Sequence, residues 1–141
     1  VIAARQFQVV FSKNEKKICQ AVKRILQQQG YGAVKKDVLF QIGTEAPAVV
    51  DSLSGQELLF LTDEYVISRM IYNAAVQAIC RYIVIHQQIK LADCRDLLQT
   101  NRNAALRILE YMDRQHITKR QETYRVLDYR GLQILGENNH G

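Results

Sequence analysis

The feature that most constrains the fold of this chain is a repeat of capping and apolar positions at a spacing of 56 residues. The paired positions are Asp37 and Asp93, Ile42 and Leu98, Thr44 and Thr100, Ala48 and Ala104, and Leu53 and Leu109. Because residues of similar kind recur in the same order, we interpret the repeat as an internal duplication. A chain of 141 residues is long enough for two small domains of this kind.

The first copy predicts three helices followed by a hairpin. In "SKNEKKICQAVKRILQQQG", Ser12 and Glu15 form a capping box and Gly30 ends the helix. Two shorter helices are predicted in "KKDVLFQIG" and in "EAPAVVDSLSG", the latter capped by Thr44, and a hairpin in "ELLFLTDEYVIS". A short strand is expected at 7–11, ahead of the first helix.

The second copy begins with a long helix in "RMIYNAAVQAICRYIVIHQQ" and then repeats the same order. A short strand and helix in "IKLADCRDLLQ", a helix in "TNRNAALRILEYMDR" and two strands in "HITKRQETYRVL" follow. The predicted fold is mainly α with small β-hairpins, in two tandem winged-helix (helix-turn-helix) domains. We assign them to residues 1–68 and 69–130, and expect the C-terminal tail, 131–141, to fray at its polar end.

Composition argues against several classes of protein. The longest apolar stretch is interrupted by polar residues, so no membrane span is expected. Three widely spaced cysteines and three isolated histidines predict neither a disulfide framework nor a metal site, and reduced thiols fit a cytoplasmic protein. We find no nucleophile–base pattern, and expect no enzyme activity and no cofactor in these residues. The chain begins with Val1, which suggests part of a longer protein or a processed product.

Charge distinguishes the two copies more clearly than the overall net charge of +5 does. Residues 34–68 carry two lysines against six acidic residues, whereas residues 86–130 carry nine basic against six acidic residues. The helix expected to face nucleic acid in the first copy contains Glu45 and Asp51 and no basic residue, so we interpret it as structural or as a protein contact. A polyanion should therefore prefer the second copy.

In the second copy, the equivalent helix combines a positive end with a polar face. Thr100 is expected to cap it, and Arg102 lies in its first turn. Asn103, Arg107 and Arg114 fall near one face, while Leu106, Leu109 and Met112, with Leu97 and Leu98 behind them, are expected in the core. The polar face also fits a second interpretation, a solvated surface with intrahelical ion pairs through Glu110.

The segment "IKLADCRDLLQTNRNAALRILEYMDRQHITKRQETYRVL" resembles the last winged-helix domain of SelB, the bacterial selenocysteine-specific elongation factor. The similarity rests on "RDLL", on Thr-x-Arg opening the helix, on "LEYMDR", on "TKR" and on "RVL". The rest of the chain fits the preceding winged helix of that family by pattern. Two departures are Asn101-Arg102-Asn103, where the family commonly has Ser-Arg-Lys, and Gln121-Glu122-Thr123, where it often has a glycine in the wing turn.

The resemblance implies an RNA-binding module that recognises a messenger-RNA hairpin, the selenocysteine insertion element, in a factor that delivers selenocysteyl-tRNA during translation on the ribosome. It implies RNA contacts at Arg102, Lys119 and Arg120, and a GTPase domain elsewhere, since no GxxxxGK[ST] motif occurs here. The candidate RNA-binding residues are Thr100, Asn101, Arg102, Asn103, Arg107, Arg114, Lys119, Arg120 and Arg125. We expect a monomer, and the alternatives are a DNA-binding winged-helix transcription regulator and a protein-interaction module.

Overall fold

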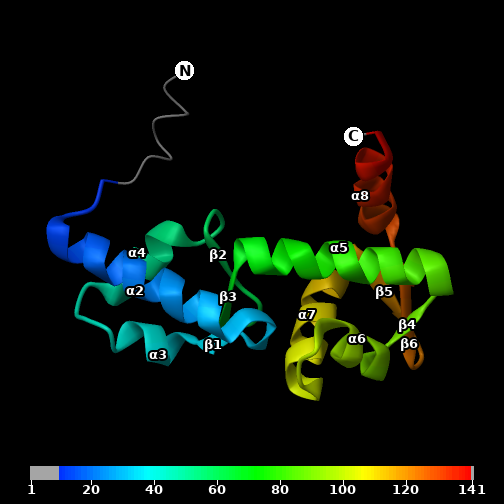
Figure 1. Ribbon diagram of the computed structural model, residues 1–141, viewed down its shortest axis with the longest axis horizontal. Coiled ribbons are helices and arrows are strands. Elements are labelled where there is room, and N and C mark those ends of the chain that lie inside the picture. The colour runs from blue at the N-terminus through cyan, green and yellow to red at the C-terminus, as the bar shows by residue number, and fades with distance from the viewer. Residues whose placement is uncertain (1–9, 141) are drawn as a thin grey trace.

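The computed structural model describes residues 10–140 and shows two winged helices in tandem, built mainly of helices with two small antiparallel sheets (Figure 1). The predicted fold class is therefore confirmed. The strand expected at 7–11 lies largely outside the described residues, and Val10 and Phe11 belong to no helix or strand.

In the first winged helix, the long helix ends at Gly30, as the sequence predicts. Its elements are α2 (Lys13–Gln29), the 3-10 helix η1 (Gly30–Gly32), β1 (Val34–Lys35), α3 (Lys36–Phe40), α4 (Ala46–Leu53), β2 (Leu58–Phe60) and β3 (Tyr65–Ser68). The capping box is confirmed, since Ser12 Oγ accepts from Glu15 N at 3.2 Å and Ser12 N donates to Glu15 Oε1 at 2.8 Å. The Thr44 cap is wrong, because Glu45 occupies the N-cap of α4 and makes no capping hydrogen bond.

The second winged helix repeats this order. Its elements are α5 (Arg69–His86), β4 (Ile89–Lys90), α6 (Leu91–Leu98), α7 (Arg102–Arg114), β5 (Thr118–Gln121) and β6 (Tyr124–Leu127). The two sheets have the same strand order, β1-β3-β2 and β4-β6-β5. Val34 pairs with Val66 in the first sheet and Ile89 pairs with Arg125 in the second, so Val66 and Arg125 occupy equivalent positions.

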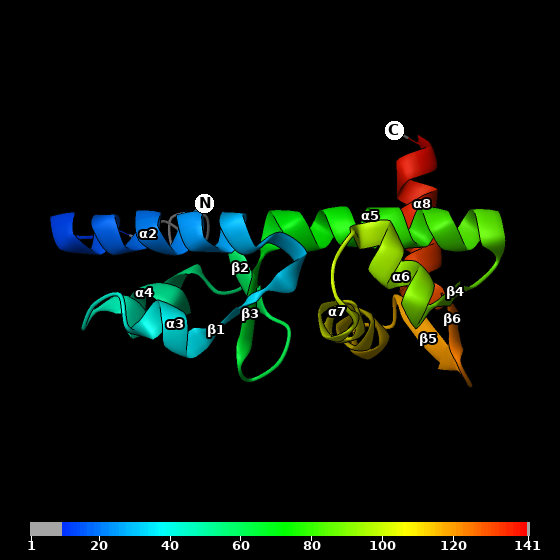
Figure 2. The ribbon, with the colours of Figure 1, turned by 60° about the horizontal axis from the view of Figure 1, so that its bottom comes forward.

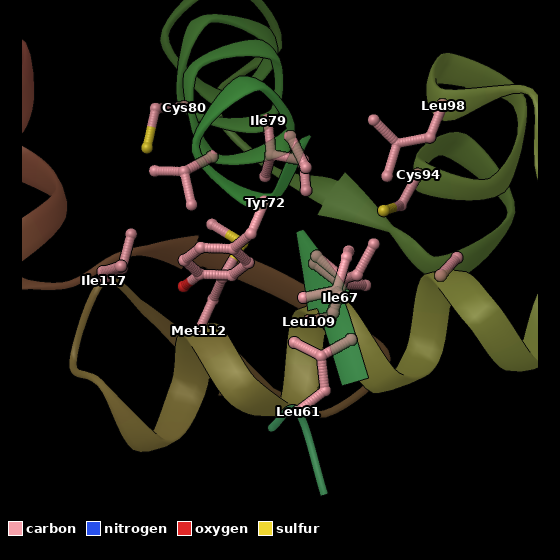
Figure 3. Packing of buried hydrophobic residues seen from close by; sticks show 14 of the residues in the cluster. Leu61, Ile67, Tyr72, Ile79, Cys80, Cys94, Leu98, Leu109, Met112 and Ile117 are labelled. Atoms are coloured by element: carbon pink, nitrogen blue, oxygen red, sulfur yellow. The ribbon is translucent and has the colours of Figure 1, made fainter. Parts of the chain in front are cut away.

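A core cluster crosses between the two winged helices. Residues of α2, α3 and α4 form a cluster within the first unit, but Ala33, Leu59, Leu61 and Ile67 pack in the cluster built by α5, α6 and α7 (Figure 3). Figure 3 shows Leu61 and Ile67 beside Leu109 on α7. The predicted domain limits stay a prediction, because the first unit supplies part of the second unit's core.

Most of the predicted core of α7 is confirmed. Leu109 and Met112 are fully buried, Leu98 is buried behind them, and Leu106 is partly buried. Leu97 is the exception: its side chain is 37% exposed, because α6 directs Leu98 and Cys94 inward instead.

The C-terminal tail forms an element that the sequence analysis did not predict, α8 (Tyr129–His140). A Cβ atom on Gly131 would lie 2.3 Å from the carbonyl oxygen of Ile117, so a residue without a side chain allows the start of α8 to pack tightly. Ile134 and Leu135 pack against the shared core. In Figures 1 and 2, α8 extends to one side of α5, whereas α6, α7 and the β5–β6 hairpin lie on the other.

Candidate nucleic-acid interface

The N-terminal end of α7 is capped by Asn101, so the predicted Thr100 cap is wrong. Asn101 Oδ1 accepts from Ala104 N at 2.9 Å. Thr100 instead lies in the turn that follows α6, where its N–H donates to Arg95 O at 3.0 Å. The preceding residue, Gln99, has a left-handed conformation with φ 52°. The cap uses the side-chain oxygen of Asn101, an exposed residue, and leaves its side-chain NH2 group free of this hydrogen bond.

Two exposed side chains occupy the first turn of α7. Arg102 and Asn103 are both exposed, and within residues 10–140 neither side chain makes a hydrogen bond or ion pair. Their backbone N–H groups belong to the first helical turn, which has no preceding carbonyl to bond and carries the positive end of the helix dipole. A guanidinium beside such N–H groups suits phosphate, which accepts hydrogen bonds from both.

The β5–β6 hairpin presents two further cations. Lys119 and Arg120 are exposed on β5, and Arg120 Nε donates to the carbonyl of Glu122 at 3.1 Å. Figures 1 and 2 place this hairpin and α7, the elements that carry both groups of basic residues, on the same side of α5. They come from different elements, and no ion pair within the described chain neutralises Lys119 or Arg102.

Arg107 is partly buried against the first winged helix, and its predicted RNA contact stays a prediction. Its guanidinium carbon lies 3.7 Å from the centre of the Tyr65 ring, and Nη2 donates to the carbonyl of Gly32 at 3.1 Å. Both partners belong to the first winged helix, so Arg107 joins the two units. Its guanidinium group is therefore engaged in contacts within the protein.

Arg114 is exposed and also contacts the first winged helix, and its predicted RNA contact stays a prediction. Its Nη2 donates to the carbonyl of Leu61 in the first unit, and its guanidinium carbon lies 5.5 Å from the centre of the Tyr111 ring. The face of α7 that carries Arg107 and Arg114 therefore packs against the first winged helix. Asn103 and Glu110 on the same helix remain exposed.

Arg125 is 3% exposed and held in an internal network, so its burial argues against the RNA contact, which stays a prediction. Its Nη2 and Nε donate to Asp113 Oδ2 at 3.1 and 3.3 Å. The other carboxylate oxygen of Asp113 accepts from the Thr118 hydroxyl at 2.6 Å, and Thr118 is fully buried. Asp113 lies at the end of α7, and so this network fixes both strands of the hairpin to the helix.

The equivalent helix of the first unit has the opposite character. α4 contains Asp51 and no basic residue, and Glu45 at its N-cap accepts from the Asn14 amide at 2.9 Å. An acidic N-terminal end repels phosphate. The geometry therefore agrees with the charge contrast between the two copies.

Sequence reasoning missed two residues that shape the candidate interface. The first is Tyr65, whose ring packs against the guanidinium of Arg107. The signal in the sequence that could have indicated this contact was an aromatic residue in the hairpin of the first unit. Glu122 takes a left-handed conformation with φ 54° in the β5–β6 turn, where glycine is usually found. The turn itself was predicted, but not this strain.

Residues 81–127 match the family model described as "Elongation factor SelB, winged helix". The fold also matches that of the mRNA-binding domain of elongation factor SelB from E. coli, solved in complex with SECIS RNA, with a TM-score of 0.67 and 22% identity. That match covers 84% of this chain and 99% of the other. The chain resembles SelB.

A second solved structure supports the SelB fold in a larger protein. The bacterial selenocysteine-specific elongation factor EF-Sec matches with a TM-score of 0.66 and 15% identity, over 84% of this chain and 20% of that one. The chain thus spans about a fifth of the length of that factor. Comparison with curated protein sequences gives no match. Across residues 10–140, no helix combines the length and apolar character needed to cross a bilayer.

Proposed function

We propose that this chain binds a messenger-RNA hairpin of the selenocysteine-insertion type through its second winged helix. The observation that carries the proposal is at the N-terminal, positive end of α7. There the Arg102 side chain is exposed and makes no hydrogen bond or ion pair within the described chain. The SelB relative bound to SECIS RNA has the same fold. Asn101, Asn103, Lys119 and Arg120 extend this end into a surface of exposed donors.

The chemistry of an RNA hairpin fits this surface. The stem offers phosphate groups along an A-form backbone, and the loop offers unstacked bases that a guanidinium can stack on or hydrogen-bond. Arg102 and the first-turn N–H groups of α7 would hold phosphate or a loop base, while Lys119 and Arg120 would neutralise the adjoining backbone. Arg107, Arg114 and Arg125 would act on RNA only indirectly, by fixing α7 and the hairpin.

A gel-shift comparison tests the class of ligand. A hairpin RNA with a bulged stem and a small loop should bind more tightly than duplex DNA of equal length and charge. Equal or tighter binding of duplex DNA would favour the transcription-regulator alternative, whereas no binding of either would favour a protein-interaction module.

A pair of arginine variants tests the site. Arg102→Ala should cost on the order of 1–3 kcal/mol of RNA-binding free energy, and log affinity should fall with log salt at a slope of about −2 to −4 for the unmodified chain. Arg95→Ala is the matched control, because Arg95 is also exposed and pairs only with Asp96. Equal losses in both variants, with circular dichroism unchanged, would remove Arg102 from the site.

The remaining proposals concern the longer protein. We place this chain in a cytoplasmic translation factor whose GTPase domain lies outside these residues and which carries selenocysteyl-tRNA to the ribosome. Within that factor the chain would need no cofactor of its own and would act as a monomer. Mass photometry of the full-length factor with and without hairpin RNA tests the monomer.

A further inference from the structure

A second basic surface lies on α2, far from the proposed hairpin site. It consists of Lys13, Lys16, Lys17 and Arg24, which we call the α2 basic face. All four side chains are exposed, and in the described chain none forms an ion pair or hydrogen bond through its side chain. Lys23 lies beside them and pairs loosely with Glu57 at 3.7 Å.

The four cations share one side of a straight helix. At 100° per residue they fall within roughly a third of the helix circumference, and Lys13 and Arg24 are about 16 Å apart along the axis. Ile18, Cys19, Val22 and Leu26 occupy the opposite side and are buried against the rest of the first unit. The only acidic residue of α2, Glu15, is engaged by the backbone of Ser12.

The fold itself does not require this charge. The internal repeat offers a comparison, because α5 occupies the place of α2 in the second winged helix. Over its 18 residues α5 carries two basic residues, Arg69 and Arg81, and Arg69 donates to the carbonyl of Gly55. The charge on α2 is thus a property of the first unit's own surface.

The chemistry of the α2 basic face points to a polyanion that stays in water. No large apolar side chain is exposed between Lys13 and Gln29, so the helix has nothing to insert into a lipid bilayer. Gln20, Gln27 and Gln28 are exposed among the cations and add amide donors. Ammonium, guanidinium and amide donors in a row suit phosphate and ribose oxygens along a nucleic-acid backbone.

We propose that the α2 basic face binds the backbone of a second, double-helical RNA segment while the second winged helix holds its hairpin. Figures 1 and 2 place α2 at one end of the molecule and α7 with the β5–β6 hairpin toward the other. The two surfaces therefore face different RNA segments, and the chain bridges them. The proposal does not depend on which hairpin the second winged helix recognises.

The test uses the whole chain, a labelled loop-free RNA duplex and an unlabelled hairpin RNA kept at saturation. The variant Lys13→Gln/Lys17→Gln/Arg24→Gln keeps helix-forming side chains while removing three charges. It should weaken duplex binding and reduce the log–log salt slope by about 3, with hairpin affinity unchanged. Lys13→Arg/Lys17→Arg/Arg24→Lys preserves the charge and should bind the duplex as the unmodified chain does.

Two controls separate this site from the hairpin site and from general charge. Arg102→Ala should weaken the hairpin and leave duplex binding intact. Lys35→Gln/Arg81→Gln/Lys90→Gln removes three exposed cations elsewhere and should leave most of the duplex affinity. The proposal is overturned if this control loses as much affinity as the α2 variant, if saturating hairpin displaces the duplex, or if polyglutamate of equal charge competes as well as RNA.

Discussion

The guanidinium carbon of Arg107 lies 3.7 Å from the centre of the Tyr65 ring, and this contact joins the two winged helices. The same guanidinium donates to Gly32 O, whereas its Nε is buried without a hydrogen-bond partner. A cation over an aromatic face is stabilised by the ring's electron-rich surface, most strongly where water is excluded. Arg107 therefore contributes to the relative placement of α7 and not to a free basic surface.

A double-mutant cycle should detect this coupling. Arg107→Ala and Tyr65→Ala should each destabilise the chain, and the double variant should lose about 0.5–2 kcal/mol less than the sum of the two. Urea unfolding of the four proteins measures the difference. Additive losses would mean that the ring and the guanidinium do not interact in solution.

Arg125→Met should destabilise the second winged helix by about 3 kcal/mol, because it leaves Asp113 with the Thr118 hydroxyl but without its cation. Lys119→Met on the neighbouring strand is the matched control, and should change stability by less than about 0.5 kcal/mol since Lys119 is exposed. Denaturant unfolding gives both values.

The same pair separates structural from RNA-contacting charge. Under conditions where both are folded, the salt slope of hairpin binding should fall by about 1 in Lys119→Met and stay unchanged in Arg125→Met. A reduced slope in Arg125→Met would show that the buried guanidinium reaches the RNA.

Glu122→Gly should stabilise the hairpin by about 0.4–1 kcal/mol, since glycine adopts the observed φ of 54° without the steric cost of a side chain. Glu122→Gln removes the same negative charge but keeps the strained backbone. The midpoint temperature of thermal unfolding should therefore rise for Glu122→Gly alone. Both variants should bind RNA slightly more tightly, because both lose the negative charge. Equal thermal shifts would attribute the effect to charge.

Alkaline pH should weaken the fold through two thiols. Burial raises the pKa of Cys80 to about 11 and that of Cys94 to about 12, with the charge of Arg125 partly opposing the shift at Cys94. The unfolded thiols lose their protons first, so their contribution is fully present below about pH 8.5 and is lost as pH rises toward the folded pKa values.

The measurement compares urea unfolding at pH 7 and pH 10 for the unmodified chain and for Cys80→Ala/Cys94→Ala. The unmodified chain should lose about 1–2 kcal/mol more per thiol over that interval. Other titrating groups are common to both proteins and cancel in the comparison. An equal pH dependence would show that the thiols titrate alike in the folded and unfolded states.

Periodicity predicted the elements and much of the core because caps and apolar spacing are local properties of the chain. Leu109 and Met112 are buried at the predicted helical spacing, and Ser12 caps α2 as predicted. Leu97 was assigned inward because adjacent leucines in a short helix leave the buried face ambiguous, and Leu98 takes the core position.

The candidate interface was only partly predictable, because charge on a helix does not reveal what packs against it. Arg102, Lys119 and Arg120 lie exposed, whereas Arg107 contacts a ring 42 positions earlier in the chain. The burial of Arg125 was not predicted, for a different reason. α7 has 13 residues and α4 has 8, so the repeat spacing changes before the hairpins and hides the correspondence of Arg125 with Val66.

The core cluster that crosses from Leu61 and Ile67 into α7 limits how the two copies of the repeat can change over evolution. The α4 helix of the first copy packs in the other core cluster, whereas the wing of that copy packs in the same cluster as Leu109 and contacts Arg107 of its neighbour. Substitutions at the wing of the first copy and along α7 should therefore arise in compensating pairs. The first copy should therefore stay constrained as part of the second copy's scaffold.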